Sequence, residues 1–353
     1  MKRVFLFTTM TAGLISLCSS AVAKPLKVYI LAGQSNMEGH AAVSTFDHIG
    51  MDPKTAPMLK EMRNADDTPR VCDNVWISYL TGGKDGNTVK QGPLTVDFGS
   101  LGKEPKIGPE FTFGIYLQKQ LNEPVLLIKT AWGGKSLYGD FLPPSGAKKS
   151  GKEAGEYYRL MIAHVKTVLG DIKKVYPGYN PEQKYEIAGF FWFQGWNDMV
   201  NGTIYPNRDK PGGYDLYSEL FADLIRDMRK DLDAPKMNVV IGVMGIGGPT
   251  ALYSSPRYKG VHQNFRDAMA APASMPEFKG NVTAVLTEKY WDSELESLVE
   301  RMGKKEALPP RELEILKKGK SNQGYHYLGS SKILGQIGKA CAEAMADFEK
   351  QKK

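Results

Sequence analysis

The chain has 353 residues, a length that suits one large α/β domain or two small ones. Hydrophobic residues make up 42% and charged residues 24%, a globular composition that excludes a disordered chain, a collagen-like repeat or a coiled coil. The net charge of +7 is mild and comes with no basic stripe or nucleic-acid motif, so no nucleic-acid partner is expected. The 3 cysteines are too few for a disulfide scaffold. Cys72 and Cys341 either pair or stay as buried thiols.

The N-terminal segment, residues 1–23, has the features of an export signal. Lys2 and Arg3 give it a positive start, an apolar run follows, and Ala-Val-Ala at 21–23 is a small-x-small cleavage pattern. An uncleaved anchor is the alternative. We expect a periplasmic or secreted protein with one domain over residues 24–353. We expect no stable membrane insertion after cleavage, since no second long apolar stretch follows.

Short apolar runs alternate with segments of helical periodicity along the rest of the chain. The runs are typical of strands covered on both faces of a parallel sheet, and they fall at 28–32, 75–79 (the weakest), 125–129, 187–193, 239–244 and 282–287. Helical spacing covers 110–121, 155–175, 214–232, 261–269 and 328–348. Repeated β-α-β units predict a doubly wound, three-layer α/β/α sandwich around a parallel sheet of about five strands.

Long stretches without either pattern interrupt this alternation, at 41–70, 81–106, 140–152 and 291–322. Long loops in a compact domain are usually functional, and ligands of open α/β sheets bind beyond the carboxyl ends of the strands. Several of these stretches follow expected strands. They are therefore predicted to form the rim of a site.

A serine follows the first expected strand. Ser35 lies in Gly-Gln-Ser-Asn-Met at 33–37, beside a glycine and before an expected helix start, which places its hydroxyl at the carboxyl edge of the sheet. Backbone N–H groups at a helix start can stabilise an oxyanion. From this fragment alone, Ser35 is either a nucleophile or a helix cap.

Two further segments add to the first, namely Trp-Phe-Gln-Gly-Trp-Asn-Asp at 192–198 and Gly-Tyr-His-Tyr-Leu-Gly at 324–329. In this order the three resemble the first, third and last blocks of the sialate O-acetylesterase-type carbohydrate esterases, within the SGNH hydrolase superfamily. They span nearly the whole chain beyond residue 23. The combination is much more specific than any one block.

The resemblance implies a carbohydrate esterase that removes O-acetyl groups through an acyl-enzyme intermediate and needs no metal or organic cofactor. Ser35 would attack the ester carbonyl, and His326 would take its proton and pass it to the leaving sugar hydroxyl. His262 is the competing candidate for the base. Activity should fall on the acid side as an imidazole near its reference pKa of about 6.5 becomes protonated.

The same resemblance implies an oxyanion hole and a sugar-binding surface. The oxyanion donors would be the Ser35 backbone N–H, the Gln194 side chain and one glycine out of Gly108, Gly133 and Gly134. Aromatic faces suit sugar rings, and side chains next to the blocks would contact the substrate. The substrate-binding candidates are Gln34, Asn36, Trp132, Trp196 and Tyr325.

Both carboxylates usual in this family are replaced. Gln323 stands three residues before His326, where the family often has aspartate, and Trp196 stands where the third block often has glutamate. We expect Asp198 to orient His326, with Gln323 or Asp292 as alternatives. A helix cap or surface acid is an equal interpretation of Asp198.

Other functions remain open at this point. A carbohydrate-binding relative that lost its catalytic carboxylates is one, and an esterase for non-sugar esters is another. No histidine has a partner at metal-ligand spacing, so no metal is expected. Lysines in 81–106 and 135–152 would ring the site and favour an acidic acetylated polysaccharide, unless they serve only solubility.

Overall fold

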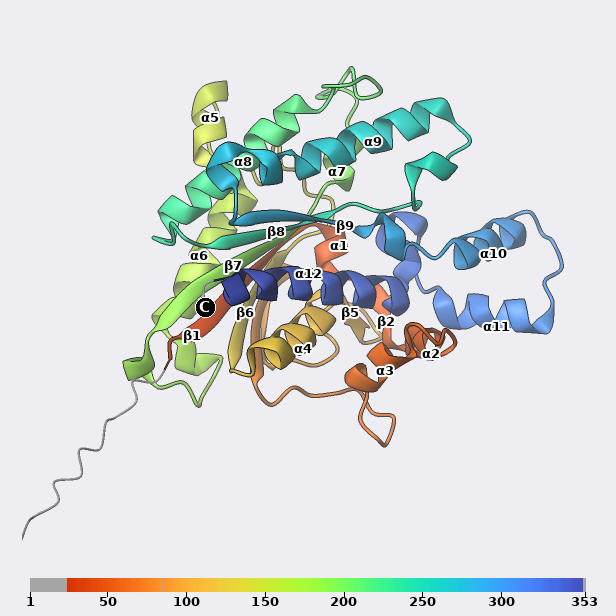
Figure 1. Ribbon diagram of the computed structural model, residues 1–353, viewed down its shortest axis with the longest axis horizontal. Coiled ribbons are helices and arrows are strands. Elements are labelled where there is room, and N and C mark those ends of the chain that lie inside the picture. Colours follow the sequence, from red (N-terminus) through yellow and green to blue (C-terminus); the bar gives the residue numbers. More distant parts are fainter. Residues whose placement is uncertain (1–23, 85, 352–353) are drawn as a thin grey trace, which may run out of the picture.

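The computed structural model describes residues 24–84 and 86–351. These residues fold around a central β-sheet (Figure 1). The strand order is β4-β3-β6-β1-β7-β8-β9, and all neighbours are parallel except β4 and β3. The strands are β1 (Leu26–Gly33), β3 (Val75–Gly83), β4 (Gly86–Pro93), β6 (Val125–Ala131), β7 (Tyr185–Phe193), β8 (Asn238–Val243) and β9 (Val282–Leu286). The expected fold class is confirmed, with more strands than the five predicted.

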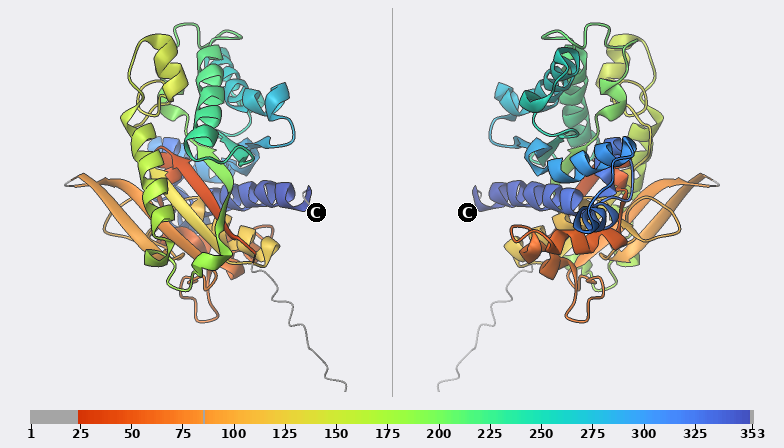
Figure 2. Two further views of the ribbon diagram at one scale, coloured as in Figure 1. Left: turned by 90° about the vertical axis from the view of Figure 1, so that its left-hand side faces the viewer. Right: turned by 90° about the vertical axis from the view of Figure 1, so that its right-hand side faces the viewer.

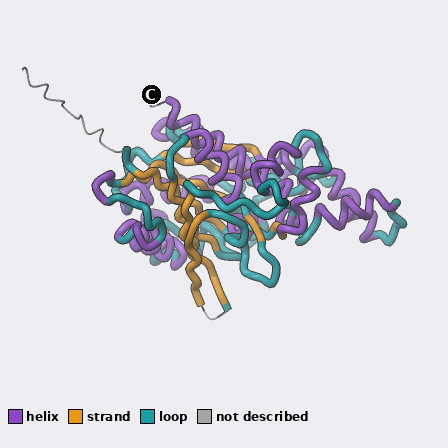
Figure 3. The backbone as a smooth tube through the Cα atoms, turned by 90° about the horizontal axis from the view of Figure 1, so that it is seen from below, coloured by secondary structure: helices purple, strands orange, loops and turns teal. Residues whose placement is uncertain are grey.

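The strand that sequence patterning missed is β4. It lies inside the stretch 81–106 that was expected to be irregular, and every residue that the structure describes in it is exposed or partly exposed. It pairs antiparallel with β3 from Trp76 opposite Pro93 to Gly83 opposite Gly86. Figure 3 shows this hairpin extending from the sheet. A polar edge strand carries no apolar run, so the periodicity could not indicate it.

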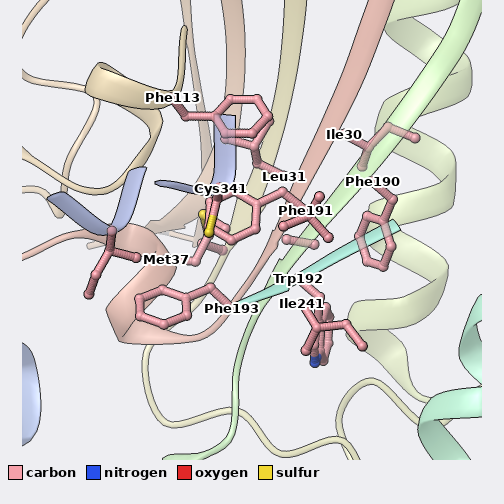
Figure 4. Packing of buried hydrophobic residues seen from close by; sticks show 14 of the residues in the cluster. Ile30, Leu31, Met37, Phe113, Phe190, Phe191, Trp192, Phe193, Ile241 and Cys341 are labelled. Atoms are coloured by element: carbon pink, nitrogen blue, oxygen red, sulfur yellow. The ribbon is translucent and has the colours of Figure 1, made fainter. Parts of the chain in front are cut away.

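Helices cover both faces of the sheet (Figure 2). On one face lie α4 (Glu110–Leu121) and α12 (Ser331–Gln351); on the other lie α6 (Glu156–Gly170), α8 (Asp215–Asp231) and α9 (Pro256–Ala270). Neighbouring side chains of β7 alternate between these layers, as Figure 4 shows: Phe191 stacks on Phe113 of α4 at 5.3 Å between ring centroids, and Trp192 packs on Phe221 of α8 at 5.7 Å. Burial on both faces explains the continuous apolar runs.

The remaining elements are short and lie mostly within the stretches expected to be irregular. They include α2 (Phe46–Gly50), α3 (Ala56–Met62), α5 (Pro144–Ser150), α10 (Ser293–Gly303), α11 (Pro310–Gly319), β2 (Ala41–Ala42) and β5 (Lys106–Ile107). Short 3₁₀ helices occur at Val43–Thr45, Ile172–Lys174, Pro181–Gln183, Thr250–Leu252, Ala271–Ser274, Pro276–Phe278 and Thr287–Tyr290. The stretches expected to be irregular therefore contain short ordered elements, as a structured rim would.

Both cysteines in the described part of the chain are free and buried. Burial raises the pKa of the Cys72 thiol to about 11, and it also raises the pKa of Cys341. Both thiols are therefore held in the neutral, unreactive form. Within residues 24–84 and 86–351, none of the helices has the length and apolar character needed to cross a membrane. The expected export signal, residues 1–23, lies outside the described residues.

Candidate active site

Adjacent strands bring two of the three motif segments together. Helix α1 (Ser35–Glu38) begins directly after β1, and α7 (Trp196–Met199) follows β7. These strands pair in parallel with Gly33 opposite Phe193, so both turns leave the same carboxyl edge. A Cβ at Gly33 would lie 2.1 Å from the Phe193 carbonyl oxygen, so only glycine allows this close approach. The third segment, η8 (Gly324–Gly329), packs against α1.

Gln34 fastens the two turns to each other. Its Oε1 accepts hydrogen bonds from the backbone N–H groups of Gly195 (3.1 Å) and Asn197 (3.2 Å). Its Nε2 donates to Asn197 Oδ1 at 2.8 Å. Gln34 is 1% exposed, and both ends of its side-chain amide are hydrogen-bonded inside the protein. It therefore connects the two turns and is not available to contact a sugar.

Ser35 lies at the start of α1, where it is 7% exposed. The Gly133 position is its neighbour across the site, since a Cβ added there would lie 3.9 Å from Ser35 Cβ. Gly133 follows β6 and is exposed, as is Gly134, which has φ of 73° and open space around it. Of the three predicted glycines, the structure places Gly133 beside Ser35.

A buried ion pair beneath α1 explains why Gly108 differs. Lys129 and Glu110 are both 0% exposed, and their charged atoms lie 2.7 Å apart. The other oxygen of Glu110 accepts the Gly108 N–H at 2.9 Å, while Lys129 also donates to the Glu38 carbonyl at the end of α1 at 2.9 Å. The Gly108 N–H is therefore already engaged, and the ion pair fixes the end of helix α1.

Gln194 is engaged in the same way. Its Nε2 donates to Asp198 Oδ2 (2.6 Å) and to the Lys135 carbonyl (3.1 Å), and its Oε1 accepts from the Tyr217 hydroxyl (3.1 Å). Asn197 differs: Gln34 holds its oxygen, which leaves its Nδ2 group without an acceptor among the described residues. Of these two amide side chains, Asn197 is thus the one with an unengaged donor, and sequence reasoning missed it although it lies in the same block.

His326 has an amide partner where a carboxylate was expected. Its Nδ1 lies 3.0 Å from Asn322 Oδ1. Gln323 is exposed, and its contribution is a backbone carbonyl that accepts the His326 N–H at 3.0 Å. Asn322, four residues before the histidine, was not predicted, because the family pattern places the orienting acid at position 323. The next residues, Tyr327 and Leu328, have φ of 54° and 59°, a left-handed turn that is rare outside glycine.

The structure does not bring Asp198 to His326. Its carboxylate is fully buried and accepts from the N–H groups of Leu137 (2.7 Å) and Tyr138 (3.1 Å), the Tyr205 hydroxyl (3.1 Å) and Gln194. Burial raises the pKa of Asp198, against these hydrogen bonds. Its role in the structure is to anchor the 137–138 turn to α7.

Asp292, the other acid considered, also has partners elsewhere. One oxygen caps α10 by accepting the Leu295 N–H at 3.0 Å, and the other lies 2.9 Å from Lys332 Nζ. His48 lies 3.9 Å from that second oxygen. Asp292 therefore belongs to a cluster around α10 and α12.

The His326 ring contacts two other rings. His40 is stacked on it with centroids 3.9 Å apart and planes 2° apart, and Tyr325 meets it edge-on at 4.5 Å. Burial first, and then the nearby His40, lower the pKa of His326 to about 4. The imidazole is therefore neutral at physiological pH, which is the state a general base requires. The value lies below the reference pKa of 6.5 expected from the sequence.

The aromatic candidates fall into two groups. Tyr325 is 45% exposed and lies 6.0 Å from the partly buried Trp196, so these two rings can face a sugar. Trp132 is 3% exposed and its Nε1 donates to Asn87 Oδ1 of β4 at 2.9 Å, so it belongs to the interior. Asn36 is also buried, and its Oδ1 has no hydrogen-bond partner.

The competing candidate for the base, His262, lies near Trp196. Its ring is 6.5 Å from Trp196, and its Nδ1 lies 3.2 Å from the Tyr253 hydroxyl. Burial lowers its pKa to about 4. These contacts place it in the α9 layer rather than beside α1.

Several lysines of the expected rim are neutralised by acids. Lys90 pairs with Asp97, and Lys149 lies 2.7 Å from Asp223. Lys106 differs, because the only side-chain hydrogen bond of its Nζ among the described residues goes to Ser100 Oγ at 3.4 Å. Across the described part of the chain, no group of three or more His, Cys, Asp or Glu is arranged to hold a metal ion.

Comparison with known proteins gives a family and three similar structures. Residues 25–279 match the family model described as carbohydrate esterase, sialic acid-specific acetylesterase. A protein from Arabidopsis thaliana is 18% identical, with TM-score 0.48 over 92% of this chain and 98% of that one. A carbohydrate acetylesterase from Xanthomonas citri is 13% identical (TM-score 0.41; 73% and 49% covered), and NanS is 16% identical (TM-score 0.41; 75% and 78% covered). A search of curated proteins found no match.

The family match covers well over half of the chain and includes both Ser35 and the 192–198 segment. His326 lies beyond the matched residues, on the segment that packs against α1. The resemblance expected from the three motif segments is confirmed. The chain therefore belongs to the carbohydrate esterase family of sialic acid-specific acetylesterases.

Proposed function

We propose that the protein is a serine esterase that removes O-acetyl groups from sugars through an acetyl-Ser35 intermediate. The observation that carries this proposal is the convergence, at one edge of the sheet, of Ser35, Gly133 and the segment bearing His326. Family membership supplies the carbohydrate O-acetylesterase activity. The geometry supports the roles of the residues.

In this mechanism the neutral His326 removes the proton of the Ser35 hydroxyl, which attacks the acetyl carbonyl. Asn322 Oδ1 accepts from Nδ1–H, which leaves Nε2 as the basic nitrogen. The Ser35 N–H, the Gly133 N–H and Asn197 Nδ2 stabilise the tetrahedral oxyanion. His326 then gives this proton to the departing sugar oxygen, which leaves as the free hydroxyl. Water attacks the acetyl-Ser35 ester while His326 takes its proton, and the proton returns to Ser35 as acetate leaves.

The first test is removal of the nucleophile. Ser35→Ala should lower kcat on p-nitrophenyl acetate and on acetylated sugars by on the order of 10⁴-fold or more, since residues of such a unit cost about as much singly as together. Asn197→Ala should lower kcat by on the order of 10²-fold through loss of one oxyanion donor. Ser44→Ala, at an exposed serine, is the matched control.

Turnover by Ser35→Ala close to wild type would overturn the serine mechanism. An inactive wild-type protein that still binds acetylated sugar would instead favour the carbohydrate-binding relative.

We also propose that the preferred substrate carries a carboxylate and that the protein is exported. Lys106 near the site lacks an acidic partner in the described residues, and the family description specifies sialic acid, an acidic sugar. Lys106→Met should raise KM for an acetylated acidic sugar more than for p-nitrophenyl acetate. Equal effects on both substrates would reject the acidic preference. The N-terminal leader supports export, and cleavage after Ala23 on secretion would test it.

A further inference from the structure

His40 is a side chain at the site that the proposed mechanism does not use. It lies two residues after Glu38, beyond the end of α1, and is stacked on His326 with planes 2° apart. Its side chain is 16% exposed. Such a close parallel contact restricts the orientation of the His326 ring, since any rotation out of plane would clash with the neighbour.

Polar contacts fix the His40 ring in turn. Its Nδ1 lies 3.1 Å from Ser100 Oγ. Its buried Nε2 has no hydrogen-bond partner among the described residues, and the carboxylate oxygen Glu38 Oε2 lies 3.7 Å away, beyond hydrogen-bond distance. The His40 carbonyl accepts from Ser321 Oγ at 3.3 Å, which ties it to the segment that carries His326. Hydrogen bonds therefore hold His40 through its ring, by Ser100, and through its backbone, by Ser321.

Glu38 is equally well held. Its Oε1 accepts from Thr81 Oγ1 at 3.0 Å, and its backbone carbonyl accepts from the buried Lys129. A Cβ added at Gly133 would lie 3.2 Å from Glu38 Oε2 and 3.9 Å from Ser35 Cβ, so this carboxylate lies beside the nucleophile. Thus Glu38 is an acid of the site that the family pattern did not lead us to expect.

The electrostatics of His326 depend on groups from several elements. Glu38 of α1 raises its pKa, while His40 and Lys106 of β5 lower it. The ring's own hydrogen-bond partner, Asn322, is a neutral amide. When His326 takes the serine proton it becomes an imidazolium, and the carboxylate that attracts this charge is Glu38, on the side of His40.

On the basis of the proposed esterase activity, we propose that His40 and Glu38 are positioning residues: His40 fixes the plane of the His326 ring, and Glu38 supplies the negative charge that the missing aspartate would supply. In a catalytic triad the acid is hydrogen-bonded to the histidine Nδ1. Here the acid would be Glu38, which lies next to the stacked rings of His40 and His326. Because a charge acts over several ångströms in a partly buried site, contact with Nδ1 is not required.

The opposite effects of Glu38 and His40 on the pKa of His326 give a test that a merely structural role would not satisfy. Glu38→Gln keeps the acceptor for Thr81 and removes the charge. His40→Phe keeps a stacked ring and removes the ionisable group, and His40→Ala removes the stack. Glu104→Gln removes one exposed acid from the same rim and is the matched control. For each variant, kcat, KM, the pH profile of kcat/KM and the NMR titration of the His326 ring are measured.

Glu38→Gln should lower kcat about 10-fold with KM within about 2-fold, and should move the His326 titration and the acid limb to lower pH by about 0.5 unit or more. His40→Phe should move both to higher pH and retain most of kcat. His40→Ala should lower kcat about 10-fold, with partial rescue in His40→Phe.

Three results would overturn the proposal. They are a Glu38→Gln variant that behaves like Glu104→Gln, shifts of the same sign in Glu38→Gln and His40→Phe, or His40→Ala with wild-type kcat. Because the NMR titration does not depend on turnover, it tests the electrostatic part even if the wild-type protein hydrolyses no ester. Absence of turnover would count against the esterase mechanism, and unshifted titrations against this inference.

Discussion

Asn322 contacts the Nδ1 atom of His326, where the proposed mechanism would usually have an acid. An amide oxygen can accept the Nδ1 proton and select the tautomer, but it adds no charge to the site. With the ring mostly buried, the pKa of His326 is about 4. The consequence at the residue scale is that His326 stays neutral in mildly acidic solution, which is the form that the proposed mechanism needs.

The pH dependence of Asn322→Asp follows from this arrangement. The wild-type kcat/KM should stay high until the pH approaches about 4, because the neutral imidazole is the active form. A carboxylate at 322 would favour the imidazolium and should move the acid limb upward by roughly 1 unit or more. Asn322→Ala serves as the control that removes the acceptor, and should lower kcat with little change in KM. An acid limb in Asn322→Asp that coincides with wild type would contradict the assignment.

At the scale of elements, the four residues of α7 depend on the carboxylate of Asp198. It accepts two backbone N–H groups from the 137–138 turn, so it connects the ends of β6 and β7 around the site. Charged acceptors make stronger hydrogen bonds than neutral ones. The contacts of Asp198 therefore indicate a structural role between these two strand ends and no contact with His326.

The variant Asp198→Asn should therefore be a stability variant. Its amide would have to present an N–H group where four donors converge, at a cost of about 1–3 kcal/mol in the free energy of unfolding. Urea denaturation would measure that loss. The folded variant should keep kcat within about 10-fold of wild type. A loss of kcat by on the order of 10³-fold, with unchanged unfolding, would instead return Asp198 to the catalytic machinery.

Elements were predictable from the sequence where burial dictates the residue types. The runs later seen as β1, β6, β7 and β8 were found because both faces of these strands are largely covered. The edge strand β9 is only partly buried, but its β-branched and apolar residues still formed a recognisable run. The polar strand β4 and the amphipathic helices α10 and α11 were not predicted. They lie at the periphery, where few of their residues need to be apolar. Motif spacing indicated Ser35 and His326, whereas Asn322 and Asn197 become visible only when side-chain contacts show which amides are engaged and which are free.

The whole molecule carries several buried histidines whose charge is suppressed. His164 of α6 is 8% exposed, lies 3.2 Å from Ser78 Oγ of β3, and has its pKa lowered by burial to about 4. In the unfolded chain its pKa returns to about 6.5. Between these values the unfolded state binds more protons, so this contribution to stability is complete above about pH 6.5 and is lost as the pH falls towards 4.

His164→Gln should flatten this dependence. The difference between wild-type and variant unfolding free energies should decrease by about 2–3 kcal/mol from pH 7 to pH 4, because glutamine does not titrate. Denaturant titrations at several pH values measure it. A constant difference over that range would show that His164 is not held neutral in the folded protein.

The left-handed turn at Tyr327 and Leu328 has a consequence for the order of folding. Each such residue costs about 1–2 kcal/mol in an isolated segment, so the unfolded chain rarely adopts the turn. What holds it is the fully buried Tyr327, whose hydroxyl accepts the Gly245 N–H at 3.0 Å and whose ring lies 5.6 Å from Phe193.

Phe193 is the last residue of β7, and Gly245 follows the end of β8. Both partners are therefore in place only after the sheet has formed. His326 should therefore reach its working position last. On refolding from urea, far-UV circular dichroism should recover before esterase turnover does, and Tyr327→Phe should widen that interval. The chain would then pass through a state that has its architecture but does not yet have its chemistry.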